Sequence, residues 1–167
     1  MTIVNKVAQS GLITLDLEEM MLPGERVLFD LKSWLFEELI LKEKDFREHI
    51  SRHDWSQYKD KYIALTCSAD AIIPTWAFML IAVQLQAYAK KIVFGNLAAL
   101  ESELFTESIA QLNPEDYKDQ RVVIKGCSIR QVPVGAYVEL TAFLAPLVKS
   151  IMYGEPCSTV PVYKRKS

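Results

Sequence analysis

The sequence predicts an α/β fold, a three-layer sandwich with a mostly parallel sheet, and three observations support this prediction. Short, β-branched apolar runs, such as those at 62–66 and 121–125, are typical of parallel strands that are buried on both faces. A helical stretch and then a second apolar run follow each of them. The segment 58–95 also resembles the segment 117–154, so the order strand, helix, strand occurs twice.

The similarity of these two segments is the most specific pattern in the chain. With one single-residue gap in each copy, 11 of 37 aligned pairs are identical. Cys67 aligns with Cys127, and Pro74 aligns with Pro133 near the start of each helix, where a proline is well tolerated. We therefore predict two βαβ pseudo-repeats. Their strands are expected near 62–67, 91–95, 121–126 and 150–154.

The N-terminal third continues the pattern less clearly. LITLDLEEMM at 12–21 indicates a strand and a short helix with Asp16 at its start, and RVLFDL at 26–31 indicates a further strand. A chain of 167 residues fits one domain, so we expect a single domain over 1–167. Its parts would be an N-terminal extension (1–57), the two repeats, a linking helix (96–113) and a basic, solvated C-terminal tail (155–167).

Composition and missing motifs exclude several classes of function. A formal net charge of −2 provides no positive field for nucleic acid. The N-terminus does not resemble a secretory signal, so the expected location is the cytoplasm. Neither GxGxxG nor GxxxxGK[ST] occurs, which argues against the familiar nucleotide enzymes. The two histidines, His49 and His53, share one predicted helix on a face that we expect to be solvated, so no catalytic triad can be argued and an enzyme is less expected than a binding protein.

The segment 71–89 contains no charged residue. Because it includes Pro74, Thr75 and two glutamines and is flanked by strand-like runs, it indicates a buried helix rather than a membrane span. We expect this helix to be buried nearly all round. Exposure of Trp76 or Phe78, or of Leu80, would imply a homo-oligomer.

Three cysteines are the strongest candidates for a functional site. Cys67 and Cys127 end equivalent strands, and Cys157 follows the last predicted strand by three residues. If all strands belong to one parallel sheet, the three thiols lie at its carboxyl edge, where open α/β sheets bind ligands. As thiolates they could hold zinc or three corners of an iron–sulfur cluster. Two alternatives stay open, inert buried cysteines and a reactive nucleophile.

Polar residues beside the first two cysteines complete the candidate site. Ser68 and Asp70 follow Cys67, and Ser128 and Arg130 follow Cys127. Serine can cap the following helix, and Asp70 can cap it or supply an oxygen ligand. An acid in one copy and a guanidinium in the other would make a polar site that tolerates anions, or a salt bridge. We assign these four residues to cofactor binding.

The stretches DWSQYKDKYIALTCSADAIIPTWAFML, KKIVFGNLAALE and MYGEPCSTVPVYK resemble those of a domain-of-unknown-function family, number 2480, found mainly in Bacteroidetes. The resemblance covers the whole chain, from GLITLDLEE to VPVYKRK. It implies an association with iron–sulfur assembly proteins, which favours a cluster over zinc. The sequence therefore predicts an accessory protein that binds a metal ion or an iron–sulfur cluster on three cysteines. The alternative is a metal-free interaction or scaffold module with structural cysteines.

Overall fold

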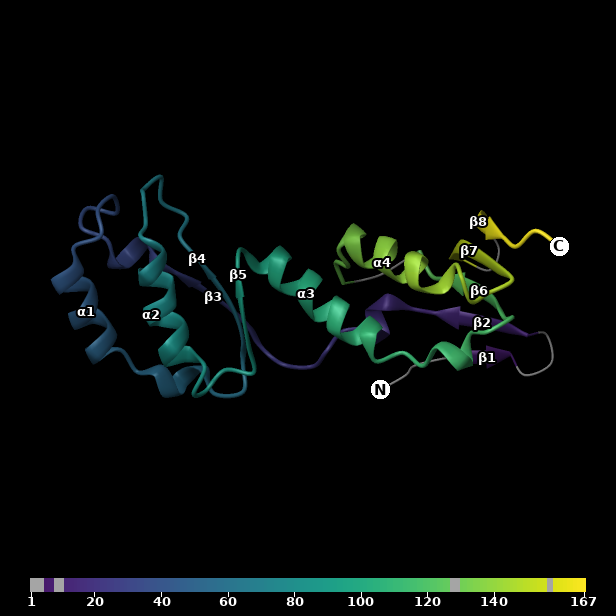
Figure 1. Cartoon of the computed structure of the whole chain (residues 1–167), viewed down its shortest axis with the longest axis horizontal. Coiled ribbons are helices and arrows are strands. Elements are labelled where there is room, and N and C mark those ends of the chain that lie inside the picture. The colour runs from purple at the N-terminus through teal and green to yellow at the C-terminus, as the bar shows by residue number, and fades with distance from the viewer. Residues whose placement is uncertain (1–4, 8–10, 127–129, 156–157) are drawn as a thin grey trace. The chain divides into compact units, whose positions relative to one another are not determined.

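The computed structural model describes all residues except 1–4, 8–10, 127–129 and 156–157, and it confirms the α/β class (Figure 1). The chain divides into two compact units. Residues 23–100 form the first, which we call the insert unit. Residues 1–22 and 101–167 together form the second, which we call the outer unit because its two parts flank the insert unit in the sequence.

The insert unit contains a three-stranded parallel sheet with the order β3-β4-β5. Its elements are β3 (Arg26–Asp30), a 3₁₀ helix (Leu31–Trp34), α1 (Glu43–Arg52), a second 3₁₀ helix (Trp55–Tyr58), β4 (Tyr62–Thr66), α2 (Thr75–Leu85) and β5 (Lys91–Phe94). Alternate residues of β4, Ile63 and Leu65, pack with Phe46 of α1 and with Ala77 and Ile81 of α2 in one core. Since side chains alternate between the faces of a strand, both helices cover the same face of this sheet.

The outer unit contains a five-stranded sheet with the order β1-β2-β6-β7-β8. Its elements are β1 (Asn5–Val7), β2 (Leu12–Leu15), a 3₁₀ helix (Leu17–Met20), α3 (Leu97–Ala110, of which 101–110 belong to this unit), a 3₁₀ helix (Pro114–Asp116), β6 (Arg121–Ile124), α4 (Val134–Leu144), β7 (Ser150–Glu155) and β8 (Ser158–Lys164). The three central strands are parallel, whereas β1 and β8 are antiparallel edge strands. Phe105 of α3 and Leu140 of α4 share one core with Ile13 and Ile124.

Apart from the edge strands β1 and β8, the outer unit has the same order of elements as the insert unit: strand, 3₁₀ helix, α-helix, 3₁₀ helix, strand, α-helix, strand. Several details also coincide at positions that the sequence alignment pairs. Asp60 and Asp119 adopt positive φ angles of 61° and 59°, and Gly95 and Gly154 adopt φ angles of 138° and 127°. The internal repeat itself stays a prediction from the sequence.

All four strands predicted within the two segments are present, and Ser150–Glu155 is a strand rather than the end of a helix. One assumption about them is corrected. The sequence argument placed both segments in one sheet, but β4 and β5 lie in the three-stranded sheet, and β6 and β7 lie in the five-stranded sheet. The reason is that β2, from the N-terminal third, pairs in parallel with β6 and takes the place expected for a strand of the first copy.

Two further expectations are wrong. The C-terminal tail is not simply a solvated end, because Ser158–Lys164 forms β8 against β7.

The helix in 71–89 is not buried all round. In α2 the fully buried residues form one stripe with a spacing of four, Ala77, Ile81 and Leu85, whereas Met79 and Val83 are 62% and 60% exposed. A helix that lies on a sheet buries one stripe, whatever the composition of its other side. Within the described residues, no helix is both long and apolar enough to cross a bilayer.

Candidate functional site

The carboxyl edge of the three-stranded sheet carries the first part of the predicted site. Cys67 directly follows β4, is partly exposed, and is a free thiol that packs partly against the core. Ser68 is fixed to the neighbouring strand, because its backbone N–H donates to Asp30 Oδ1 at 3.0 Å and its hydroxyl donates to Asp30 Oδ2 at 2.5 Å. These bonds tie the end of β4 to the end of β3.

Asp30 also caps the 3₁₀ helix that follows it, since Oδ1 accepts a hydrogen bond from the N–H of Lys32 at 3.0 Å. Partial burial opposes the ionisation of Asp30, but the hydrogen bonds from Ser68 and Lys32, with the Lys32 charge, outweigh it. The pKa of this carboxyl therefore lies below its usual value. Asp30 is an ionised anchor for this sheet edge. Its role was not predicted from the sequence, although it lies near the end of the strand predicted at 26–31.

Asp70 does not perform the capping role that was one of its two expected functions. The N-cap residue of α2 is Pro74, and among the described residues no side-chain hydrogen bond caps this helix at its N-terminus. Asp70 itself is exposed in a bend between β4 and α2. The remaining expectation for Asp70, an oxygen ligand beside Cys67, stays a prediction.

The carboxyl edge of the five-stranded sheet carries the second part. Arg130 is exposed, and its backbone N–H donates to Glu18 Oε1 at 3.2 Å. Asp16 directly follows β2 and corresponds to Asp30, the last residue of β3. It caps a 3₁₀ helix through the N–H of Glu18 and lies 3.9 Å from the ammonium of Lys125. Cys127 and Ser128 lie outside the described residues.

In the sequence, the three cysteines follow strands that belong to two different sheets. Position 127 follows β6 and position 157 follows β7, and these strands are parallel neighbours with Ile124 paired to Tyr153. Cys67 follows β4 in the other sheet. Among the described residues, no three His, Cys, Asp or Glu side chains form a group that could hold a metal ion, and Cys157, like Cys127, lies outside those residues.

Both histidines contact an aromatic cluster, and His49 also lies exposed on α1, as expected for a solvated helix face. His53 follows the last residue of α1, is partly buried, and shares a hydrogen bond of 2.6 Å with the hydroxyl of Tyr58. Burial lowers the pKa of His53, and the charge of nearby Asp54 opposes this change only in part. His49 is exposed but stacks on Trp34, with ring centroids 5.1 Å apart and an angle of 22° between the planes.

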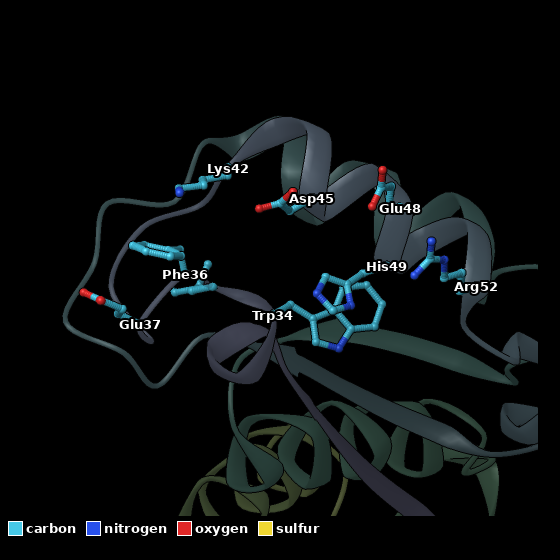
Figure 2. A pocket seen from close by; sticks show the side chains of 9 residues that line it. Trp34, Phe36, Glu37, Lys42, Asp45, Glu48, His49 and Arg52 are labelled. Carbon is cyan, nitrogen blue, oxygen red and sulfur yellow. The ribbon is translucent and has the colours of Figure 1, made fainter.

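A pocket opens beside this cluster, between α1 and the segment that follows β3 (Figure 2). It has a volume of about 340 Å³, and we call it the α1 pocket. The residues that line it include Trp34, Phe36, Glu37, Lys42, Asp45, Glu48, His49 and Arg52. The sequence analysis missed it, because Trp34 and His49 are 15 positions apart and become neighbours only through the fold. The helical spacing of Asp45, His49 and Arg52 was the available signal.

The chain belongs to the family described as "Protein of unknown function (DUF2480)", whose model matches residues 1–165. The family resemblance predicted from the sequence is thus confirmed. No curated protein and no solved structure matches the chain.

Proposed function

We propose that this protein is an accessory protein that binds a metal ion or an iron–sulfur cluster through thiolates at the carboxyl edge of the five-stranded sheet. The observation that supports this proposal is the parallel pairing of β6 and β7, since Cys127 and Cys157 follow these adjacent strands within a few residues. That edge of an open α/β sheet is the usual place for a ligand. The proposal places the protein in the cytoplasm, with iron–sulfur assembly proteins as partners.

Two thiolates leave the coordination of a metal incomplete, because structural zinc takes four ligands and a four-iron cluster takes four cysteines. The remaining ligands would come from solvent, a substrate or a further cysteine. Cys67 was the third ligand expected from the sequence, and its participation stays a prediction. Ser68, Asp70, Ser128 and Arg130 stay proposed neighbours of the bound group.

The test is anaerobic purification from cells, followed by metal analysis and a visible spectrum. Cys127→Ser and Cys157→Ser should each remove most of the metal or colour, because loss of one thiolate from a small ligand set is severe. Cys67→Ser is the deciding variant. Equal loss would make Cys67 a ligand, whereas unchanged loading would restrict the site to the outer unit.

A colourless wild-type protein without zinc or iron, which also cannot be reconstituted, would refute this proposal. A site of thiolates also predicts that binding releases protons and weakens as the pH falls, because the ligands must be deprotonated. Loading that does not depend on pH between 6 and 8 would therefore contradict thiolate coordination.

A second candidate function, a metal-free interaction module that self-associates, is favoured by the exposed side of α2. An apolar groove of about 410 Å³ runs between α1 and α2, and it is lined by Trp76, Met79, Leu80 and Val83 and by an ion pair of Glu43 and Arg47. A second copy of this chain is the proposed occupant. A twofold interface places the same patch on both copies, so adjacent acidic and basic residues can pair across it while the apolar residues become buried.

Light scattering coupled to size-exclusion chromatography tests this second candidate. The wild type should be a dimer, and the double variant Met79→Glu, Val83→Glu should be a monomer. Val138→Glu is the matched control, because Val138 aligns with Met79 and is 65% exposed on α4 of the outer unit. A monomeric wild type, or equal dissociation by the control, would exclude α2 as the contact.

A further inference from the structure

The α1 pocket occupies a place that the outer unit fills with ordinary core residues. Arg26 of β3 pairs with Tyr62, and Leu12 of β2 pairs with Arg121. Because the sequence alignment matches Tyr62 to Arg121, Arg26 corresponds to Leu12 and Trp34 corresponds to Met20. The sequence offset that pairs Tyr58 with Tyr117 likewise makes Ser108 correspond to His49. In the outer unit Met20 and Ser108 are 6% and 8% exposed, and the Ser108 hydroxyl donates to the Met20 carbonyl at 2.9 Å. The fold therefore does not require an aromatic hollow at this place.

One wall of the α1 pocket is the Trp34 ring, which its aromatic neighbours hold in place. Trp34 contacts Phe29, Phe46 and Trp55 edge to face, with centroid distances of 5.3, 5.9 and 6.0 Å. Figure 2 shows the Trp34 and His49 rings on one side of the hollow and the Phe36 ring on the other, with Asp45 reaching from α1 toward the space between them. A ligand that enters would meet a Trp34 ring already held in position.

A cation already lies on one of these walls. The Lys42 ammonium is 3.6 Å from the centroid of the Phe36 ring. The negative face of an aromatic ring attracts such a group, and the contact is favourable when it is shielded from water. The contact of Lys42 thus shows that the face of Phe36 can accommodate an ammonium group.

The charged residues around the hollow also favour a cation. Three carboxylates line it, those of Glu37, Asp45 and Glu48, against the two cations Lys42 and Arg52. Within the part of the chain that the structure describes, none of these three carboxylates forms an ion pair. Asp45 is the carboxylate that Figure 2 places toward the space between the rings.

We propose that the α1 pocket binds an alkylammonium group, held between Phe36 and Trp34 with Asp45 as its counter-ion. The group is carried either by a small amine or by the lysine side chain of a partner polypeptide, since both present the same chemistry. Lys42 is then an internal competitor that occupies the Phe36 face when the pocket is empty of ligand. The pocket volume of about 340 Å³ lies at the lower end of the range of small-molecule sites.

The experiment is a titration of the full-length protein with choline, followed by the indole N–H signal of Trp34 in a nitrogen-correlated NMR spectrum. The matched probe is 3,3-dimethylbutan-1-ol, which has nearly the shape of choline but no charge. Choline should give a saturable shift of the Trp34 signal at a concentration at least about tenfold lower than the alcohol, because only choline gains the cation–π and carboxylate attraction.

Three variants make the result specific. Phe36→Ala and Asp45→Asn should each weaken choline binding about five- to tenfold. Lys42→Gln should strengthen it, because the competing ammonium is removed. Lys44→Gln and Asp60→Asn are the matched controls, since both residues are exposed and do not line the pocket; neither should change the affinity. A preserved spectrum outside the pocket shows that each variant is folded.

A lysine-containing peptide distinguishes the two sources of the ammonium group. Binding at least about tenfold tighter than that of choline supports a partner lysine, and equal or weaker binding supports a small amine. Three results would overturn the proposal: equal binding of the uncharged alcohol, a response of the Trp34 signal to inorganic phosphate but not to choline, and unchanged or weaker choline binding in Lys42→Gln.

Discussion

The insert unit and the outer unit carry a tyrosine at the same place in two different environments. Tyr58 shares its hydroxyl with His53 at 2.6 Å, in a cluster with Phe29, Trp34 and Trp55. Tyr117 is fully buried, and within the described residues its hydroxyl has no hydrogen-bond partner. Burial, with a smaller contribution from Asp116, raises the pKa of Tyr117 to about 12. One arrangement of elements thus supports both an apolar core and a polar aromatic cluster. Because the fold does not require the cluster, its presence in one unit supports the proposed ammonium site beside it.

The largest expected effect tests whether the two cores are equivalent. Phe46 and Phe105, at aligned positions of α1 and α3, are 0% and 1% exposed. Phe46→Ala and Phe105→Ala should each lower the free energy of unfolding by about 3–5 kcal/mol, because each leaves a large cavity. Urea denaturation measures the loss, and hydrogen exchange shows which unit opens. A decrease in the free energy of unfolding of less than about 1 kcal/mol for either variant would show that the two cores are not equivalent.

A smaller effect distinguishes the two aspartates at the strand ends. Asp30→Ala removes the acceptor for two N–H groups and one hydroxyl, so we expect a cost of about 2 kcal/mol. Asp16→Ala removes one capping bond and a long ion pair, and its expected cost is about 1 kcal/mol. Both values come from the midpoint of urea unfolding. The reverse order would mean that the bond from β4 to β3 through Ser68 does not stabilise the insert unit.

The tyrosines themselves predict effects of opposite sign. Tyr58→Phe should destabilise the protein by about 1 kcal/mol, because the hydrogen bond to His53 is lost. Tyr117→Phe should stabilise it by about 1 kcal/mol, because it removes a buried hydroxyl that has no partner among the described residues. Thermal unfolding of both variants gives the comparison. Destabilisation by Tyr117→Phe would show that this hydroxyl is bonded in solution.

The smallest effect concerns pH. The lowered pKa of His53 means that the unfolded chain takes up a proton first, at its ordinary pKa of about 6.5, while the folded protein keeps this ring neutral. Stability should therefore fall as the pH decreases below 6.5 toward the folded pKa, and His53→Gln should flatten this dependence. Melting temperatures between pH 7.5 and 5.5 measure it. Tyr117→Phe is the control, and its pH dependence should match that of the wild type.

Patterns within a few residues predicted many of the strands and helices. The pairing of strands that are distant in the sequence could not be predicted. The β-branched runs and the prolines located β4, β6 and both helices that follow them, because these signals act within a few residues. The sequence did not reveal that β2 pairs with β6, because partner choice depends on packing between distant segments. The sequence also did not show that one side of α2 is exposed, since the composition of a helix does not reveal which of its sides pack against other elements.

The candidate site divides in the same way. Cys67 and Ser68 were identified from their place after a strand, and the structure ties Ser68 to Asp30. Trp34 was not identified, because nothing near it in the sequence marks its stacking with His49. Comparison with Met20, the buried core residue at the corresponding position of the outer unit, shows that the fold does not require an aromatic residue there.

The pairing of β2 with β6 has a consequence for synthesis on the ribosome. Leu15, the last residue of β2, pairs with Ile124 of β6, and the whole insert unit lies between them in the chain. At roughly 5–20 residues per second, β2 leaves the ribosome several seconds before its partner, while the insert unit already has all of its strands. The insert unit can therefore fold first during translation. One side of β2 stays an open edge until β6 emerges, and nascent chains stalled between residues 100 and 120 would be the most prone to aggregate.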